Sequence, residues 1–331
     1  MLLKIAKSHQ PVLLLVSFVL AIVLSLKGFI HPQWQVFGFD SVRMPLYEII
    51  TGYVKENSFS GRMITMTIMI ILAFNMLRLN NKYILIPERT YLPTVFFILL
   101  LFSLIPLQRM NPVIFASLFL TYAIERILDS YRKDLLCYNF FDSSFLIALA
   151  SLFYLNSVFF IIVSWIGLII FRTFNWREWF YTFLGFGIPC LFLFSIYYIT
   201  GRDYKPLLLT IQNNFKAMPV FVVKDSYLLL FCYIIFLIFI SSYFIIRSLP
   251  GFKILSRKTF NLLFFCFMIG VLVYVLVSSA SLEVMTMIVT PISFLLTFYF
   301  NKIKSRWIGE ILFGILIVLI IIVQIYPVWN L

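Results

Sequence analysis

Charged residues are scarce in this chain: Asp, Glu, Lys and Arg make up 12% of its 331 residues, while hydrophobic residues make up 63%. So few polar side chains cannot cover the surface of a water-soluble protein of this size, which excludes two or three ordinary soluble domains. The composition indicates that a lipid bilayer is the solvent of most of the chain. The sequence therefore predicts an all-α fold, a polytopic transmembrane helix bundle that forms one integral membrane domain over residues 1–331.

Histidine is rarer still, since His9 and His31 are the two in the chain. Two histidines cannot build a four-histidine iron site, a pair of haem ligands within the membrane or a zinc protease helix. The four cysteines show no CxxC spacing and three of them lie in apolar runs, which favours small buried side chains over disulfides. No metal and no cofactor is expected.

The chain also lacks the phosphate-binding motifs GxxxxGK[ST] and GxGxxG and the nucleophile motif GxSxG, so nucleotide-driven or hydrolase chemistry is not indicated. The middles of the apolar runs carry no ionisable side chain, which argues against a proton-coupled pump or an ion channel. The net charge of +13 comes from basic residues scattered through short loops. That distribution suits anionic lipid headgroups and not nucleic acid.

Eleven apolar segments approach the length of about 20 residues that a spanning helix needs. They are 11–28, 62–79, 91–107, 112–128, 141–155, 157–171, 176–199, 226–245, 260–278, 284–300 and 308–326. The first follows two lysines, as a signal peptide would, but no cleavage site follows it, so we expect an uncleaved helix. The fifth and sixth segments are short, and the alternative for this pair is a tight hairpin that stops before the far surface.

The basic residues predict an orientation for these segments. With the N-terminus inside, 17 of the 26 Lys and Arg residues lie on the inner side, and the short outer turns at 155–157 and 279–283 have none. Eight of the other nine lie in or beside two long outer loops, 29–61 and 200–225. The positive-inside rule therefore predicts the N-terminus inside and the C-terminus outside.

The outer loop 29–61 holds a candidate catalytic acid. From Pro45 onward apolar residues recur at helical spacing, which predicts a short helix lying flat in the membrane interface. Asp40 stands just ahead of this helix and is either a general base or an ordinary turn residue. In the second outer loop Arg202 is a candidate phosphate ligand, unless the loop is merely solvated.

Two further candidates lie in short outer connections. Glu283 stands alone before an apolar run, so it is either a capping acid that favours the helix dipole or a functional carboxylate. Arg109, between the third and fourth spans, is expected to face the same outer cleft and to bind phosphate there. A reaction at the outer face would then use Asp40 and Glu283 as its carboxylates.

On the inner side, the stretch RTFNWREWFY at 172–181 concentrates aromatic and charged residues between two apolar runs. Asn175, with Glu178 three residues later, is typical of a capped helix start. Trp176 and Trp179 then share one helix face, as interfacial anchors do. One interpretation of the stretch is therefore a membrane-surface anchor.

The same stretch permits a functional interpretation. Arg172 and Arg177 together could grip a lipid phosphate or pyrophosphate, which the forked donors of arginine suit. Both interpretations stay open at the level of sequence. Elsewhere on the inner side, Asp142 followed by two serines predicts the start of another helix.

Three stretches carry a resemblance: YRK at 131–133, FDSSFLIALASLFYL at 141–155 and FNWREW at 174–179. Over most of its length the chain resembles an uncharacterised family of polytopic inner-membrane proteins of Bacteroidota. The resemblance implies a multi-pass protein of the bacterial inner (cytoplasmic) membrane. Some members have been labelled carotene monooxygenases, but those oxygenases bind iron through four histidines, so the label does not fit this sequence.

More distantly, the layout is similar to membrane glycosyltransferases that use polyprenyl-phosphate sugars. Those enzymes share a long first outer loop with an interfacial helix and a catalytic acid, and short paired helices in mid-chain. The resemblance implies that Asp40 is the catalytic acid. In an enzyme of this kind we expect Arg109 and Arg202 to hold the phosphate of a polyprenyl-phosphate carrier. Ser41 follows Asp40 where a second acid often stands in those enzymes.

Three functions remain open at this stage. The first is a glycosyltransferase-like enzyme of cell-envelope glycan or lipid assembly. The second is a non-catalytic subunit or scaffold that docks other envelope proteins, and the third is a lipid or small-molecule transporter without ion coupling. Membrane lipids are expected partners in each case, and nucleic acid in none.

Overall fold

The computed structural model describes residues 11–30, 42–86, 88, 90–131, 138–201, 203, 205–216, 225–280, 282–303 and 305–325. Within these residues the fold is all-helical and has no strand, as the composition predicts. The α-helices are α2 (Pro11–Ile30), α4 (Pro45–Tyr53), α5 (Phe59–Tyr83), α6 (Leu92–Phe102), α7 (Pro112–Asp129), α8 (Tyr138–Phe153), α9 (Ile161–Phe171), α10 (Trp176–Ile199), α11 (Lys205–Lys216), α12 (Asp225–Ser248), α13 (Ile254–Leu276), α14 (Met285–Lys302) and α15 (Arg306–Ile325). The 3-10 helices are η1 (Ile105–Gln108), η2 (Leu155–Phe160), η3 (Leu249–Gly251) and η4 (Leu282–Val284).

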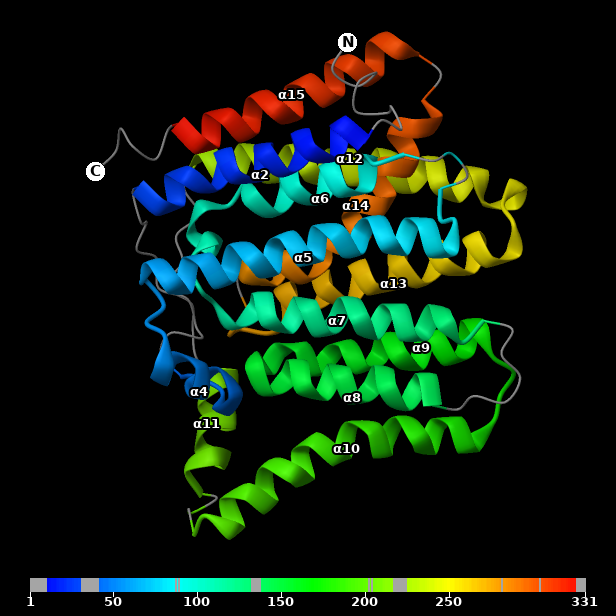
Figure 1. Cartoon of the computed structure of the whole chain (residues 1–331). Coiled ribbons are helices and arrows are strands. Elements are labelled where there is room, and N and C mark those ends of the chain that lie inside the picture. Colours follow the sequence, from blue (N-terminus) through cyan, green and yellow to red (C-terminus); the bar gives the residue numbers. More distant parts are fainter. Residues whose placement is uncertain are drawn as a thin grey trace.

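The helices other than α4 and α11 form one bundle and alternate in direction, so successive connections fall at opposite ends (Figure 1). The short helices α4 and α11 lie next to each other across one end, which we call the α4 end. At the opposite end α5 and α7 finish and α10 begins; we call it the Trp176 end. Side chains on different connections can therefore meet only if their connections share an end.

Among the residues that the structure describes, six helices are long and apolar enough to cross a membrane, as expected of a membrane protein. They are Phe59–Tyr83, Trp176–Ile199, Tyr227–Gly251, Ile254–Leu276, Leu282–Lys302 and Trp307–Ile325. The prediction of eleven spans is thus corrected to six, although each of the eleven predicted segments contains a helix. The main reason is length: α6 and α9 have 11 residues each, about 17 Å of helix against a hydrocarbon core of about 30 Å.

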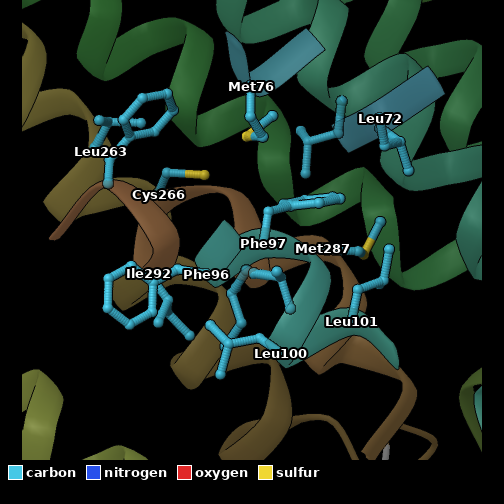
Figure 2. Close-up of a cluster of buried hydrophobic side chains, with 14 of the residues drawn as sticks. Leu72, Met76, Phe96, Phe97, Leu100, Leu101, Leu263, Cys266, Met287 and Ile292 are labelled. Carbon is cyan, nitrogen blue, oxygen red and sulfur yellow. The ribbon is translucent and has the colours of Figure 1, made fainter. Parts of the chain in front are cut away.

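The helix α14 is the most enclosed of the six, with 94% of its apolar stretch buried, compared with 17% for α10. Figure 2 shows Met287 of α14 close to Phe97 of α6, and Cys266 of α13 and Met76 of α5 in the same cluster. These side chains belong to one continuous hydrophobic core, which includes buried residues of α5, α6, α13 and α14. The core therefore surrounds α14.

Small residues allow several helix pairs to approach closely. Ser143 of α8 and Ser164 of α9 share a hydrogen bond of 2.7 Å between their hydroxyls. A Cβ atom added to Gly270 of α13 would overlap the side chain of Ile288 in α14. Packing of this kind holds helices together where apolar burial alone gives no advantage over lipid.

Two helix starts test the local predictions. Asn175 caps α10, because its side-chain oxygen accepts a 3.1 Å hydrogen bond from the backbone N–H of Arg177, so this predicted start is confirmed. The start predicted at Asp142 is wrong, since α8 already begins at Tyr138. Asp142 instead lies inside the helix, where its carboxylate is 3.7 Å from Arg126 of α7.

The two predicted outer loops both contain helices. The short helix predicted from Pro45 is confirmed as α4. In the second loop, 200–225, the structure has α11, which the sequence reasoning did not predict. Its pattern was readable in the sequence, because Leu207, Ile211 and Asn214 recur at helical spacing and the first and last of these are buried.

Candidate functional site

The helix α4 is fastened to the α4 end by its buried side. Tyr47 is fully buried, and its hydroxyl donates a 3.1 Å hydrogen bond to the carbonyl of Met110. Arg43, just ahead of the helix, pairs with Glu56 beyond it at 3.2 Å. Tyr53, the last residue of α4, is 89% exposed. A short helix packed on one side and bare on the other suits the membrane interface.

The helix α11 is tied both to α4 and to the connections of the bundle. The side-chain nitrogen of Asn214 lies 3.5 Å from the sulfur of Met44, just before α4. Ser278, which follows α13, donates a 3.3 Å hydrogen bond to the carbonyl of Phe215. The ring of Phe215 also lies edge-on to Phe159, with centroids 6.2 Å apart. These contacts hold α11 across the same end as α4.

Glu283 is fully buried within a hydrogen-bonded network at the α4 end. The hydroxyl of Tyr154 donates to its carboxylate at 3.0 Å, and the side-chain amide of Asn156 donates to that hydroxyl, also at 3.0 Å. The amide also donates to Ser279 at 3.2 Å, and the Ser279 hydroxyl lies 3.3 Å from the amide oxygen of Asn156. The network joins the α8–α9 connection to the α13–α14 connection.

The environment of Tyr154 keeps its hydroxyl protonated. Burial raises the pKa of Tyr154 well above its usual value of 10, and the nearby charge of Glu283 raises it further. Tyr154 is therefore a permanent donor to the Glu283 carboxylate at physiological pH. This arrangement fixes the position of Glu283, whereas its catalytic role stays a prediction.

The partners of Glu283 were missed at the level of sequence. Tyr154 and Glu283 are separated by 129 positions in the chain, so no local pattern connects them. A weak signal existed, because Asn156 and Ser279 are polar residues in two turns predicted to lie on the same side.

Arg109 lies between η1 and α7, at the same end as Glu283. Its carbonyl accepts a 3.0 Å hydrogen bond from the side chain of Asn111, which also caps the start of α7. The predicted catalytic residue Asp40 and the predicted phosphate ligand Arg202 lie outside the described residues. Of the four predicted outer site residues, the structure brings Arg109 and Glu283 to one end of the bundle.

At the Trp176 end, the candidate phosphate ligands Arg172 and Arg177 have different surroundings. The guanidinium of Arg172 lies 3.8 Å from the carboxylate of Glu178, and their side chains are 12% and 8% exposed. This pair joins the end of α9 to the first turn of α10. Arg177 is exposed. Phosphate binding by this pair stays a prediction, for which Arg177 is the accessible member.

The two predicted anchors on α10 also differ. Trp176 is 66% exposed, as a residue at a membrane surface can be. Trp179 packs between other aromatic rings, with centroid distances of 6.3 Å to Trp165 and 6.5 Å to Phe174. Trp179 therefore holds α10 to α9 and to the α9–α10 connection.

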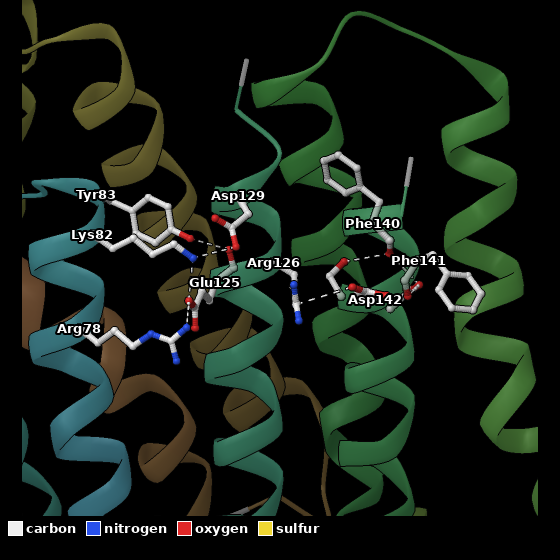
Figure 3. Close-up of polar contacts among 11 residues, drawn as sticks. Arg78, Lys82, Tyr83, Glu125, Arg126, Asp129, Phe140, Phe141 and Asp142 are labelled. Carbon is white, nitrogen blue, oxygen red and sulfur yellow. Dashed lines mark hydrogen bonds and ion pairs between the residues drawn. The ribbon is translucent and has the colours of Figure 1, made fainter. Parts of the chain in front are cut away.

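An ion-pair network that the sequence reasoning missed joins α5 to α7 at this end (Figure 3). The ammonium of Lys82 lies 2.9 Å from both Glu125 and Asp129, and Arg78 lies 2.9 Å from Glu125. The hydroxyl of Tyr83 donates to the backbone carbonyl of Glu125 at 3.0 Å. The signal was available, because two bases four residues apart and two acids four residues apart fall at the same predicted surface.

The described residues include no cluster suited to a metal ion, and one small cavity lies between α2 and α5. No group of three or more His, Cys, Asp or Glu side chains there could hold a metal ion. A small cavity between Gly28 of α2, Met66 of α5 and Gln108 has room for about one water molecule. The arrangement at the α4 end is thus a platform of two short helices beside a buried polar network.

Comparison with known proteins places the chain in a family. No curated protein and no solved structure matches it. A model of a family of unknown function, DUF6427, matches residues 40–328, which include every helix from α4 to α15. This agrees with the resemblance to an uncharacterised family. The chain therefore belongs to the family of unknown function DUF6427.

Proposed function

We propose that the protein is a multi-pass protein of the bacterial cytoplasmic membrane that acts as a glycosyltransferase-like enzyme in cell-envelope glycan or lipid assembly. Its N-terminus lies inside the cell, so the α4 end faces outward. Its donor substrate is a sugar carried on polyprenyl phosphate. Transfer takes place at the membrane surface, next to α4 and α11.

One observation carries this proposal: α4 and α11 lie together across one end of a membrane helix bundle, at the end that also holds Arg109 and Glu283. A lipid-linked donor keeps its hydrocarbon chain in the bilayer and its phosphate at the surface. An enzyme for such a donor needs apolar helices beside polar groups at that depth. The α4 end supplies both.

The proposed chemistry is a substitution at the anomeric carbon of the donor sugar. Asp40 accepts the proton of the acceptor hydroxyl as its oxygen forms a bond to that carbon. The bond between the carbon and the phosphate oxygen breaks, and polyprenyl phosphate leaves. Arg109 and Arg202 hold the phosphate, and Glu283 is the second carboxylate.

The mechanism is tested by Asp40→Asn in the full chain, reconstituted in vesicles with a labelled polyprenyl-phosphate hexose. Loss of the base is expected to slow release of polyprenyl phosphate by at least about a hundredfold. Asp203→Asn is the matched control, because Asp203 is an exposed acid near α11. Full transfer by the Asp40→Asn protein would remove this mechanism.

A second candidate function is a non-catalytic membrane subunit of an envelope complex. The enclosure of Glu283 favours it, because a carboxylate with 0% exposure among protein partners is suited to a structural role. Purification in mild detergent separates the two functions. Co-purifying polyprenyl phosphate supports the enzyme, and a partner protein at fixed stoichiometry supports the subunit.

A further inference from the structure

The helix α10 uses one stripe of its surface to pack against the bundle. Its buried residues are Glu178, Thr182, Gly185 and Pro189, which recur at intervals of three and four and so share one face. A Cβ atom on Gly185 would overlap the backbone and side chain of α8 there, so the two helices approach closely at this glycine. All four buried residues lie in the first 14 positions of the helix.

Beyond Pro189 the same stripe continues but is uncovered. Its next members are Phe192, Leu193 and Ile196, and we call these three residues the uncovered stripe. Phe192 is 64% and Ile196 is 55% exposed, and Leu193 is half-buried. The residues of the stripe are therefore as apolar as a packing face, yet no helix among the described residues covers them.

The path of α10 explains this change. Proline lacks the backbone N–H and its ring pushes on the preceding turn, so it bends a helix. Figure 1 shows the second half of α10 diverging from α8 towards the α4 end. On α8, Phe145 and Leu149 continue the face that contacts α10, and both are partly exposed. Beyond Pro189, α10 and α8 therefore each carry partly or fully exposed apolar side chains on the faces by which the two helices contact each other nearer the Trp176 end.

The helix α11 follows directly and brings positive charge to the end of the uncovered stripe. The chain turns at Gly201, which has a left-handed φ of 63°, and α11 starts at Lys205. Lys205 is exposed. At the other end of α11, Lys216 is also exposed, more than 15 Å of helix away by rise per residue (about 1.5 Å).

We propose that the uncovered stripe of α10 and the facing side of α8 bind the hydrocarbon chain of a lipid phosphate, and that Lys205 is a further cation for its phosphate besides Arg109 and Arg202. The argument is complementarity: an apolar surface of two helices continues into a cationic group at the depth of a headgroup. A phospholipid that lies beside a single helix contacts one apolar surface, whereas a lipid at this site would contact both α8 and α10. The proposal rests on the proposed function, because it gives the donor lipid of that reaction its place.

The test measures binding of polyprenyl phosphate to the purified full chain by native mass spectrometry in detergent. Competitors are a polyprenol of equal length, which lacks the phosphate, and phosphatidylglycerol, a bulk anionic lipid. Ile196→Trp fills the stripe and is expected to weaken binding at least tenfold. The matched control is Ile235→Trp on α12, because Ile235 is 48% exposed on another face of the bundle. It should bind within about twofold of the wild type.

The headgroup contact has its own pair of variants. Lys205→Gln is expected to reduce the preference for polyprenyl phosphate over polyprenol, whereas Lys216→Gln leaves the preference unchanged. Displacement by phosphatidylglycerol as readily as by polyprenyl phosphate would show an ordinary boundary lipid and overturn the proposal. Unchanged binding in Ile196→Trp would overturn it as well.

The binding test is independent of the enzyme test because it requires no turnover. If Asp40→Asn keeps full transfer while Ile196→Trp loses lipid binding, the proposed mechanism fails and the lipid site stands. If Asp40→Asn abolishes transfer while Ile196→Trp binds normally, the lipid site fails and the mechanism stands.

Discussion

Two polar networks, one at each end of the bundle, join helices by different interactions. At the Trp176 end, Arg78 and Lys82 pair with acids of α7, and their side chains are 51% and 36% exposed. At the α4 end, Glu283 is 0% exposed and accepts a hydrogen bond from the buried Tyr154. Water and salt screen the first set of interactions but not the second.

The buried Glu283 network has lost more contact with water than the ion pairs of Arg78 and Lys82, so its polar groups depend more on their protein partners. A buried polar network stabilises a fold when every member has a partner, and it destabilises the fold strongly when one partner is removed. Exposed ion pairs are tolerant of change in comparison. The Glu283 network should therefore respond to substitution more strongly than the network of Arg78 and Lys82, and it lies at the end where we place the function.

The largest expected effect is that of Glu283→Ala. It leaves the hydroxyl of Tyr154 without its acceptor and opens a small cavity, so it should lower the free energy of unfolding by about 3 kcal/mol. Thermal unfolding in mild detergent measures the loss. Glu88→Ala is the control, since the Glu88 side chain is 53% exposed and pairs with Lys302 at 3.5 Å. A loss no greater than that of the control would contradict the comparison.

The next effect is that of Glu125→Gln at the Trp176 end. It removes the shared acceptor of Arg78 and Lys82 and should cost about 1–2 kcal/mol at low salt, because both bases are partly exposed. In about 1 M salt, where the Debye length is about 3 Å, the cost should shrink. A loss that exceeds that of Glu283→Ala, or that salt does not change, would break the distinction between the ends.

A smaller effect with a characteristic pH dependence is expected for Tyr154→Phe. Loss of the hydrogen bond to Glu283 should cost about 1 kcal/mol near pH 7. Because the pKa of Tyr154 is raised in the fold above its ordinary value of 10, its contribution is fully present below about pH 10. It falls as pH rises further, because the unfolded chain then releases the proton first.

The measurement compares the unfolding free energies of wild type and Tyr154→Phe from neutral to alkaline pH. The difference between the two proteins should be constant up to about pH 10 and should then decrease, because Phe has no proton to release. A difference that grows at alkaline pH would show that the Tyr154 hydroxyl is not held protonated.

The smallest effect is expected at the exposed aromatic of the Trp176 end. Trp176→Ala should change the unfolding free energy in detergent by less than about 0.5 kcal/mol, because the side chain is 66% exposed. Trp179→Ala should cost about 1 kcal/mol or more, since Trp179 packs against Trp165. Equal losses in the two variants would show that the anchor is part of the packing.

The helices of the bundle were predictable from hydropathy, but their burial was not. The stretches of α10 and α14 have similar mean hydropathies of 1.8 and 1.6, yet 17% of one and 94% of the other is buried. Hydropathy measures compatibility with a dry environment, and both lipid and protein provide one. The predicted number of spans was wrong for a related reason. A short apolar helix such as α6 is enclosed by its neighbours, so its hydropathy does not require that it crosses the bilayer.

The candidate site was predictable only in part. Glu283 stood out because it is a lone acid between apolar runs, and its position at one end of the bundle follows from helix order. Its partner Tyr154 lies 129 residues away, so it required the fold. The pair of Arg172 and Glu178 was likewise missed, because Glu178 fits a capping pattern whose spacing hides its partner across the connection.

The central claim is that the two ends face opposite sides of a membrane, with the α4 end outward. Two glycines test it directly, since a Cβ on Gly52 of α4 or on Gly251 at the opposite end meets nothing within 4 Å. In a chain freed of its own cysteines, Gly52→Cys should react with a membrane-impermeant maleimide added to spheroplasts, and Gly251→Cys should react only after the membrane is permeabilised. Labelling of both from outside, or of Gly251→Cys alone, would contradict the account.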